Sequence, residues 1–400
     1  MRRLVYILII FFIVTSCIEE YTIPKSVLIN SKQVVIQGRI LAGEESVFYV
    51  SYTKAFGDRS QLQETILNAK VTIIGQNGYE SKKAEFDMEN DRYFIDTKDL
   101  EANTLYAVRV EVEGETYQSE YLSILQTPEI EEITYTESPN GISLLVSTKG
   151  DNDGSRYYMW SYEEDWEFTA SIDFKAEPEK YYYNEFTYPI GENQPNPYYR
   201  CWGHNLSSNI YLGSTDKLNE NIIKNLKLFT ISADDVRISN VYSLLLKQWT
   251  LSKEAYAYYT QMQQLTEKND GIFQLMPYEI KGNVHCISTP SKKTLGYVIA
   301  SNITTKRKFI FVSDFKQCIP VFTGICSETS ITKENFDWQT IENELRGGAI
   351  FYIPTKINFN HFWEYTPTGK EIIYSKQCVD CRTVEGSTNK RPDFWPIINE

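Results

Sequence analysis

Four carboxylates stand close together near the middle of the chain, beside two tryptophans. They are Glu163, Glu164, Asp165 and Glu167, beside Trp160 and Trp166. A pair of carboxylates is the machinery of most glycoside hydrolases, in which one acts as the acid and the other as base or nucleophile. Charged residues alternating with aromatic ones are also typical of a strand with one solvated and one packed face. Catalysis by these carboxylates is one hypothesis, and a structural strand is the other.

A stretch crowded with aromatic residues follows the carboxylates. Tyr and Trp provide a large contact area at low entropy cost, and each carries a hydrogen-bonding tip. Such residues on a loop can form a platform for a sugar, a peptide or another protein, whereas on a strand they belong to the core. The candidates for ligand or partner binding are Tyr181, Tyr182, Tyr183, Tyr198, Tyr199 and Trp202.

The chain has seven cysteines, and without Cys17 six remain, an even number that fits disulfides in an exported protein. Six cysteines allow 15 pairings, and the sequence leaves the choice open. Nearness favours Cys378 with Cys381 and Cys318 with Cys326, which leaves Cys201 with Cys286. The C-x-x-C pair lacks a second C-x-x-C or a nearby histidine, so we expect a structural disulfide there and not a metal or redox centre.

Cys17 belongs to a targeting segment. Arg2 and Arg3 precede an apolar run of 11 residues, Leu4–Val14, which is too short to span a bilayer as a helix and fits a secretory signal. Thr15 and Ser16 then lead to Cys17, as in a bacterial lipobox, so we expect cleavage after residue 16 and a lipid on Cys17. An ordinary signal peptide with an incidental cysteine is the alternative. Several acyl chains on one residue would anchor the protein firmly to a membrane.

Two acids directly after the anchor, Glu19 and Glu20, resemble the short export signal of lipoproteins on the outer face of the outer membrane. Their alternative role is the start of a solvated tether. We predict a lipid-anchored outer-membrane protein that faces the cell exterior, with a tether over residues 17–30.

The elements that would position these residues are mainly strands. Between residues 31 and 126, about seven short strands separated by turn signals predict an Ig-like β-sandwich. Its clearest strand is 105–112, in which Tyr106, Val108 and Val110 alternate with outward-facing polar residues. The pattern of residues 127–400 predicts a larger β-rich domain with a cysteine-bearing C-terminal tail. This domain contains a helical insertion at about 252–269, for which Ser252 is the expected N-cap.

Composition excludes several classes of function. The chain carries 53 Asp and Glu against 40 Lys and Arg, a net charge of −13, which argues against nucleic acid as a partner. It has three histidines, little material for histidine catalysis or a histidine-rich metal site. The sequence contains none of the motifs G-x-S-x-G, H-E-x-x-H, G-x-x-x-x-G-K-[ST] or G-x-G-x-x-G. We therefore expect no cofactor and no metal.

Several motifs, taken together, resemble the Bacteroidota lipoproteins grouped as domain-of-unknown-function family 4249. The resemblance rests on the lipobox, the early strand at Val34–Gly38, the Arg200-Cys201-Trp202 motif and, most specifically, the tail from Cys378 to Trp395. In the usual tail two glycines stand where this chain has Glu385 and Gly386. The resemblance implies an accessory lipoprotein of a TonB-dependent outer-membrane transporter, because genes for such transporters commonly neighbour those of the family. It implies no catalytic residues.

The function that we predict from the sequence is therefore non-catalytic: a surface lipoprotein that partners a TonB-dependent transporter in nutrient uptake. A surface hydrolase using Glu163–Glu167 and a structural envelope lipoprotein are the alternatives.

Overall fold

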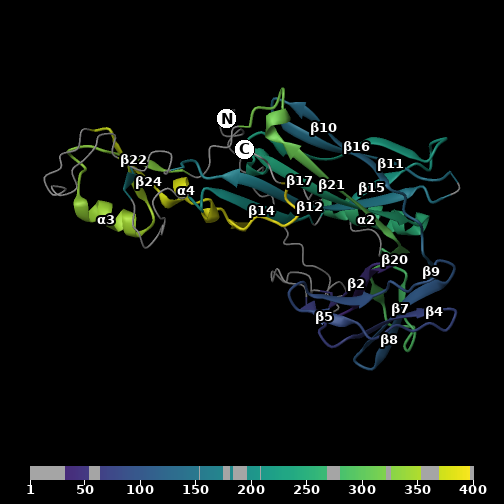
Figure 1. The fold of residues 1–400 in the computed structure, drawn as a ribbon. Coiled ribbons are helices and arrows are strands. Elements are labelled where there is room, and N and C mark those ends of the chain that lie inside the picture. The colour runs from purple at the N-terminus through teal and green to yellow at the C-terminus, as the bar shows by residue number, and fades with distance from the viewer. Residues whose placement is uncertain are drawn as a thin grey trace, which may run out of the picture.

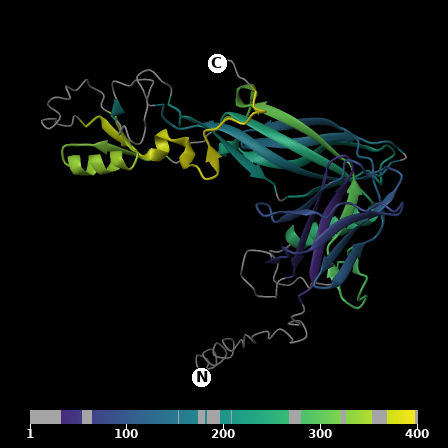
Figure 2. The ribbon, with the colours of Figure 1, turned by 60° about the horizontal axis from the view of Figure 1, so that its bottom comes forward.

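The computed structural model describes residues 32–53, 64–152, 154–173, 181–182, 196–207, 209–267, 280–320, 326–352 and 369–396. The protein is mainly β, as the sequence predicts, and consists of three parts (Figure 1). An N-terminal sandwich packs beside one end of a central sandwich, and a small lobe projects from the other end (Figures 1 and 2). Cys17 and Tyr183 lie outside the described residues.

The N-terminal sandwich has two sheets whose apolar faces enclose one core. One sheet has the order β19-β1-β2-β6-β5, with β20 beside β1 and β3 beside β2, and the other has the order β18-β8-β7-β4, with β9 beside β7. The strands of the first are β1 (Val34–Leu41), β2 (Glu45–Tyr52), β3 (Glu64–Thr65), β5 (Glu85–Asp87), β6 (Arg92–Asp96), β19 (Thr294–Leu295) and β20 (Val298–Ser301). Those of the second are β4 (Lys70–Gly75), β7 (Leu105–Val112), β8 (Glu115–Ser119), β9 (Leu122–Ser123) and β18 (Val284–Cys286).

Local pattern explains most of this sandwich. In β7, Tyr106, Val108 and Val110 are fully buried in the core, whereas Arg109 is partly exposed, so the expected alternation is confirmed. The turn from β7 to β8 has positive φ at both central residues, Glu113 at 50° and Gly114 at 80°, the signs of φ that a type I′ hairpin requires.

Three strands of the N-terminal sandwich come from residues 284–301, which we expected in the second domain. β19 and β20 pair with β1 in parallel, and β18 pairs with β8. Gly296 lets this segment approach closely, because its φ is +105° and a side chain there would overlap the carbonyl oxygen of Ile36. A boundary at residue 126 thus divides the strands of one sandwich. Val284 pairs with Ser119 across 165 positions and Val298 with Gly38 across 260, and pairing over such distances leaves no local signal, because it is set by tertiary packing.

The central sandwich also has two sheets. The β11 sheet has the order β10-β11-β16, and the β12 sheet has the order β21-β17-β12-β14-β25, with β15 beside β12. The first consists of β10 (Ile130–Ser138), β11 (Gly141–Lys149) and β16 (Ile222–Ser232). The second consists of β12 (Tyr157–Thr169), β14 (Arg200–Leu206), β15 (Tyr211–Ser214), β17 (Val241–Leu251), β21 (Ile303–Phe311) and β25 (Ser387–Thr388). Leu144 from the first sheet and Trp160 and Leu244 from the second are fully buried in their shared core.

The expected helix, α2 (Lys253–Glu267), lies between the two sandwiches. The Ser252 hydroxyl accepts a hydrogen bond from the Ala255 N–H at 3.1 Å and so caps the first turn. Ala255 and Tyr258 are buried against Tyr297 and Leu41 of the N-terminal sandwich and against strands of the central one. The helix is thus part of the core that joins the two sandwiches.

In the described residues, the lobe has one sheet of order β13-β23-β24-β22 and one packed helix. Its described elements are β13 (Tyr181–Tyr182), β22 (Glu328–Ile331), α3 (Trp338–Arg346), β23 (Ile350–Tyr352) and β24 (Glu371–Tyr374). The short helix α4 (Lys376–Val379) and the 3₁₀ turn η5 (Cys381–Thr383) lead back to the central sandwich; the other 3₁₀ turns that the structure describes are η2 (Val236–Ile238) and η3 (Val312–Asp314). Among the described helices, none combines the length and apolar character needed to cross a bilayer.

Candidate functional site

The four candidate carboxylates lie on β12, near the end of the sheet from which the lobe projects, and they point to both faces of the strand. Glu164 points inward, is fully buried and accepts three hydrogen bonds. The donors are Arg237 Nη1 at 2.8 Å, Tyr242 Oη at 2.6 Å and Asn205 Nδ2 at 3.1 Å. Both of its oxygens are therefore occupied, and the carboxylate is the centre of a buried network.

Electrostatics keep that network in one protonation state. Burial disfavours the charge on Arg237, yet the hydrogen bond with Asp235 and the charge of Glu164 outweigh it and raise the pKa of Arg237. Burial and the adjacent Glu164 charge raise the pKa of Tyr242 well above its ordinary value. Tyr242 therefore stays neutral and donates to Glu164, and Arg237 stays charged.

Asp165 lies on the outward face of β12, between a histidine and an arginine. Its Oδ1 is 2.7 Å from His204 Nδ1, and its Oδ2 accepts from Arg307 Nη1 at 2.8 Å. Arg307 Nη1 also donates to Ser243 Oγ at 2.7 Å. Serine, aspartate and histidine thus meet on three adjacent strands, but the aspartate is in the middle. A serine nucleophile needs the histidine next to it, so this order does not form a catalytic triad.

The remaining two carboxylates of the cluster are also paired. Glu167 is buried and accepts hydrogen bonds from Asn240 Nδ2 at 2.6 Å and from Trp395 Nε1 at 3.0 Å, with Arg200 Nη1 at 3.6 Å. Glu163 pairs with Lys247. A general acid or base has to reach the substrate. Three of these four carboxylates are buried among donors of the protein, so this geometry is that of structural ion pairs.

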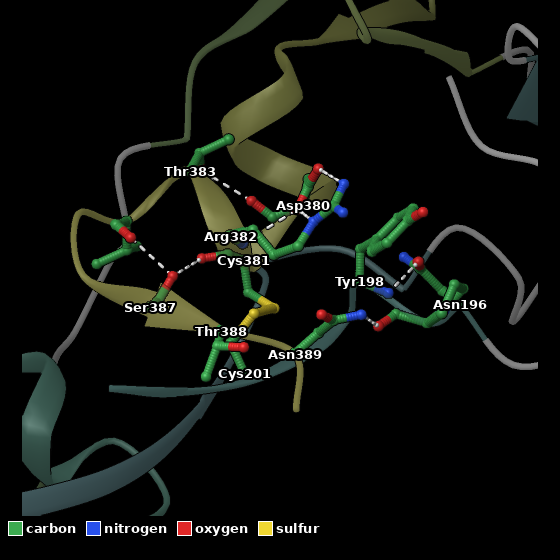
Figure 3. Close-up of a disulfide and its surroundings, with 12 residues drawn as sticks. Asn196, Tyr198, Cys201, Asp380, Cys381, Arg382, Thr383, Ser387, Thr388 and Asn389 are labelled. Carbon is green, nitrogen blue, oxygen red and sulfur yellow. Dashed lines mark hydrogen bonds and ion pairs between the residues drawn. A yellow bond between two sulfur atoms is a disulfide. The ribbon is translucent and has the colours of Figure 1, made fainter. Parts of the chain in front are cut away.

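Trp395 belongs to a C-terminal strap, residues 380–396, that returns from the lobe and lies along the β12 sheet (Figure 2). The Cys201–Cys381 disulfide fixes the beginning of the strap to β14 (Figure 3). Within the strap, β25 adds to the edge of β14, with Thr388 opposite Trp202. Near the end of the strap, Trp395 is buried against Trp202 and Val241.

An arginine stacked on a tyrosine holds the strap at its start. The Asp380 carboxylate accepts from Arg382 Nε at 2.9 Å and Nη2 at 2.7 Å, and this pair raises the pKa of Arg382. The guanidinium lies 3.4 Å from the centre of the Tyr198 ring (Figure 3). The Cys381 N–H donates to the Tyr198 carbonyl at 2.9 Å. The disulfide, the ion pair and the stacking contact therefore all involve the same short segment, residues 380–382.

The turn at Glu385 and Gly386 accommodates the glutamate that the sequence has in place of the first of two expected glycines. Gly386 has a φ of +74°, a conformation that favours glycine, whereas Glu385 is not among the residues with positive φ. Of these two residues of this chain, only Gly386 has a backbone conformation that favours glycine.

The cysteine pairing expected from nearness is wrong. The disulfides join Cys201 to Cys381 and Cys326 to Cys378, and Cys286 and Cys318 are free and buried. The chain is extended at Asp380, between the end of α4 and the start of η5. Cys378 therefore enters one apolar cluster and Cys381 another, so the two halves of the C-x-x-C motif face different partners.

The three aromatic candidates whose side chains the structure describes do not form one platform. Tyr198 stacks on Arg382, Tyr199 packs beside the Cys201–Cys381 disulfide, and Trp202 is buried against Trp395. Each belongs to a different apolar cluster, which favours the structural alternative for these three. Tyr181 and Tyr182 form β13, of which the structure describes only the backbone.

Sequence reasoning missed an exposed aromatic residue next to these ion pairs, Phe394 of the strap. The sequence shows two adjacent aromatic residues, Phe394 and Trp395, at the end of the tail motif. The local sequence does not show which of the two is buried and which is exposed.

A second candidate site is an open groove of about 1090 Å³ over the outer face of the β11 sheet. Leu145 and Ser147 lie at its base, with Glu132 on one side and Leu218 and Glu220 on the other. Its lining mixes acids, lysines and apolar side chains, and the buried Ser147 hydroxyl at its base accepts a hydrogen bond from the Asn225 N–H at 3.0 Å. Within the described ranges, no group of three or more His, Cys, Asp or Glu residues could hold a metal ion.

Comparison with known proteins identifies a family but no characterised relative. No curated protein matches the chain. Among solved structures, a two-domain fibronectin type III segment of chicken tenascin is 9% identical with a TM-score of 0.15; the match covers 55% of this chain and 92% of that one. A trypsin-activated alpha-2-macroglobulin from Escherichia coli is 11% identical with a TM-score of 0.17; the match covers 56% of this chain and only 15% of that one.

The family match covers most of the chain. A family described as a domain of unknown function, DUF4249, matches residues 18–307, which include the N-terminal sandwich and nearly all of the central one. The chain therefore belongs to the DUF4249 family.

Proposed function

We propose that this protein is a non-catalytic lipoprotein of the outer-membrane surface that binds a TonB-dependent transporter and assists it in nutrient uptake. The lipobox-like sequence before Cys17 and the acids after it support the location. The transporter is the partner that the family resemblance implies.

The pairing of the candidate carboxylates is the observation that supports a non-catalytic function. Glu164, Asp165 and Glu167 are buried, and each accepts hydrogen bonds from side chains of the protein itself. A hydrolase that worked through these residues would need a carboxylate that can exchange protons with a bound substrate. Side chains held in this way are suited to fixing a surface in one shape, which is the requirement of a binding protein.

A detergent pull-down tests the partnership. The tagged full-length protein, produced in its own host and extracted in detergent, should retain one outer-membrane barrel protein, identified by mass spectrometry. A matched Cys17→Ala variant should lose incorporation of labelled palmitate and appear in the soluble fraction. Failure of the native chain to take up palmitate would contradict the location, and recovery without any barrel protein would contradict the partnership.

The hydrolase and envelope alternatives have separate outcomes in the same preparation. If the native protein hydrolysed a member of a polysaccharide or peptide panel and Glu167→Gln abolished this activity, the protein would be a hydrolase and the proposed non-catalytic function would be wrong. Envelope defects on deletion, without a barrel partner or turnover, would indicate a structural role.

A further inference from the structure

The outward face of the β12 sheet carries an exposed aromatic ring beside fixed polar groups. Phe394 is 45% exposed, although its neighbour Trp395 is buried. The Arg307 guanidinium lies 3.8 Å from the centre of the Phe394 ring, and the same guanidinium donates to Asp165. The ring is therefore held on one side by a cation that is itself fixed, and by the anchored residue that follows it.

A histidine completes this face. The His204 side chain is 53% exposed, and its Nδ1 is tied to the buried Asp165 carboxylate. That contact orients the imidazole and leaves Nε2 as its available hydrogen-bonding atom. Asp165 thus connects His204 to Arg307 and, through Arg307, to Phe394, so the three groups belong to one surface.

The acids Glu163 and Asp165 on this face are each paired with a base. Asp165 is paired with Arg307, and Glu163, two residues along β12 on the same face, is paired with Lys247. Each pair is neutral as a whole, so these four side chains do not favour an ionic ligand. The surface offers one apolar ring face next to oriented donors and acceptors, which matches a ligand with an apolar ring face and hydroxyl groups around its edge.

We propose that this face binds a neutral oligosaccharide, with one sugar ring stacked on Phe394 and its hydroxyl groups bonded by His204 and by the Glu163–Lys247 pair. This inference deepens the proposed function, because it names the class of nutrient that the protein binds. It rests on the proposed function only where it assumes that the bound sugar is then taken up through the transporter. Binding itself is a property of this chain and can be measured without the transporter.

The test measures binding of neutral hexasaccharides of glucose, mannose and xylose to the full-length protein. The protein is kept in a detergent without a sugar head group, and binding is followed by calorimetry. At least one hexasaccharide should bind, and Phe394→Ala should weaken it about tenfold or more, because the stacking surface is lost. Phe394→Tyr, which keeps the ring, should bind within about threefold of the native protein.

Tyr49→Ala is the matched control, because Tyr49 is 43% exposed but lies on the N-terminal sandwich. Its affinity for the hexasaccharide should equal that of the native protein. Leu218→Ala, in the groove over the β11 sheet, should also leave the affinity unchanged. Equal thermal unfolding of Phe394→Ala and the native protein separates lost binding from lost folding.

Several results would overturn the inference. They are no binding of any neutral hexasaccharide, equal losses in Phe394→Ala and Tyr49→Ala, and binding only of polygalacturonate or of peptides. A Phe394→Ala variant that still retains the barrel protein but binds no hexasaccharide supports the inference and the partnership separately. Hexasaccharide binding without any barrel partner leaves this inference standing and removes the proposed partnership.

Discussion

The two sandwiches of this protein are built on the same principle but bury different groups. The core of the N-terminal sandwich consists of aliphatic and aromatic side chains with Cys286, and among its described residues no carboxylate is buried. The central sandwich buries Glu164, Asp165 and Glu167 at one end, and a disulfide ties the strap to the same end.

This difference separates two requirements. Apolar burial alone stabilises a sandwich, since each buried side chain contributes about 1.5–3 kcal/mol. A buried ion pair is weak evidence for stability, because desolvation opposes the attraction, and its best-attested use is to specify one arrangement. We infer that the N-terminal sandwich serves mainly as a scaffold, whereas the end of the central sandwich beside the strap is built for a defined surface.

The largest expected effect comes from the disulfide of the central sandwich. Cys201 and Cys381 are 180 residues apart, and closing a loop of that length stabilises the folded state by about 5 kcal/mol in the chain-entropy account. The double variant Cys201→Ala/Cys381→Ala should therefore lower the free energy of unfolding of the central sandwich by roughly that amount. Calorimetry that resolves the two sandwiches measures it.

Cys286→Ala is the control, because it removes a buried thiol of the N-terminal sandwich that forms no bridge. Its effect should be about 1 kcal/mol, as for a small core deletion. Peptide mapping without reduction should recover Cys201 linked to Cys381 and Cys326 linked to Cys378. Recovery of a Cys378–Cys381 link instead would refute the account of the strap.

Breaking the buried network should have the next largest effect. Glu164→Ala removes a buried carboxylate, so the partly buried Arg237 is left with Asp235 alone and the buried Tyr242 hydroxyl loses its acceptor, and removing one member of a buried pair costs about 3–5 kcal/mol. Glu163→Gln is the matched control, one residue away on the opposite face, where the partly exposed pair with Lys247 contributes about 0–1 kcal/mol. Denaturant unfolding of both variants measures the contrast. Equal losses would mean that burial does not distinguish the two pairs.

Much of the fold could be predicted from the sequence because its signals are local. The alternation in 105–112 predicted β7, and Ser252 with the apolar spacing after it predicted α2. A similar local signal precedes α3 at Asp337, whose side chain caps the helix by accepting hydrogen bonds from the Gln339 and Thr340 N–H groups.

The rest could not be predicted because it depends on contacts between distant residues. Cys201 meets Cys381, Asp165 meets Arg307, and Val284 enters the N-terminal core, each across more than a hundred positions. Spacing along the chain says nothing of such pairs. The candidate carboxylates are close together in the sequence, but their partners come from other elements and decide what they do, so their roles were invisible in the sequence.

A glycine against an aromatic ring occurs in both sandwiches and allows a direct comparison of packing. A methyl group on Gly203 would overlap the Trp166 ring, and one on Gly38 would overlap the Phe48 ring and lie 2.6 Å from the carbonyl oxygen of Val47. Overpacking of this kind costs about 1–3 kcal/mol. Gly38→Ala should be the worse of the two, since a backbone oxygen in a paired strand cannot turn away. If Gly203→Ala lowered the unfolding temperature more than Gly38→Ala, the core of the central sandwich would be the one that adapts less to an added methyl group.

The smallest expected effect concerns an ion pair that fastens the late strands to the N-terminal sandwich. Glu115, at the start of β8, accepts hydrogen bonds from Lys292 Nζ at 2.7 Å, from Thr289 Oγ1 at 2.8 Å and from Ser288. The donors follow β18, so the contact joins residues far apart in the sequence. Hydrogen bonds from Lys292, Ser288 and Thr289 lower the pKa of Glu115 from 4.5 to about 2.

The direction of the pH effect follows from this lowered pKa. Because the folded state holds the Glu115 carboxylate ionised, its contribution to stability is fully present above about pH 4.5 and is lost as the pH falls towards 2. Glu115→Gln should therefore flatten the fall in the free energy of unfolding over that window, with little change in the central sandwich. Glu111→Gln, which breaks the exposed pair with Lys70, is the control for removing one charge from the same sandwich. If Glu115→Gln leaves the pH profile as steep as Glu111→Gln does, strand pairing and apolar burial hold the late strands without this ion pair, and the contrast between the two sandwiches becomes sharper still.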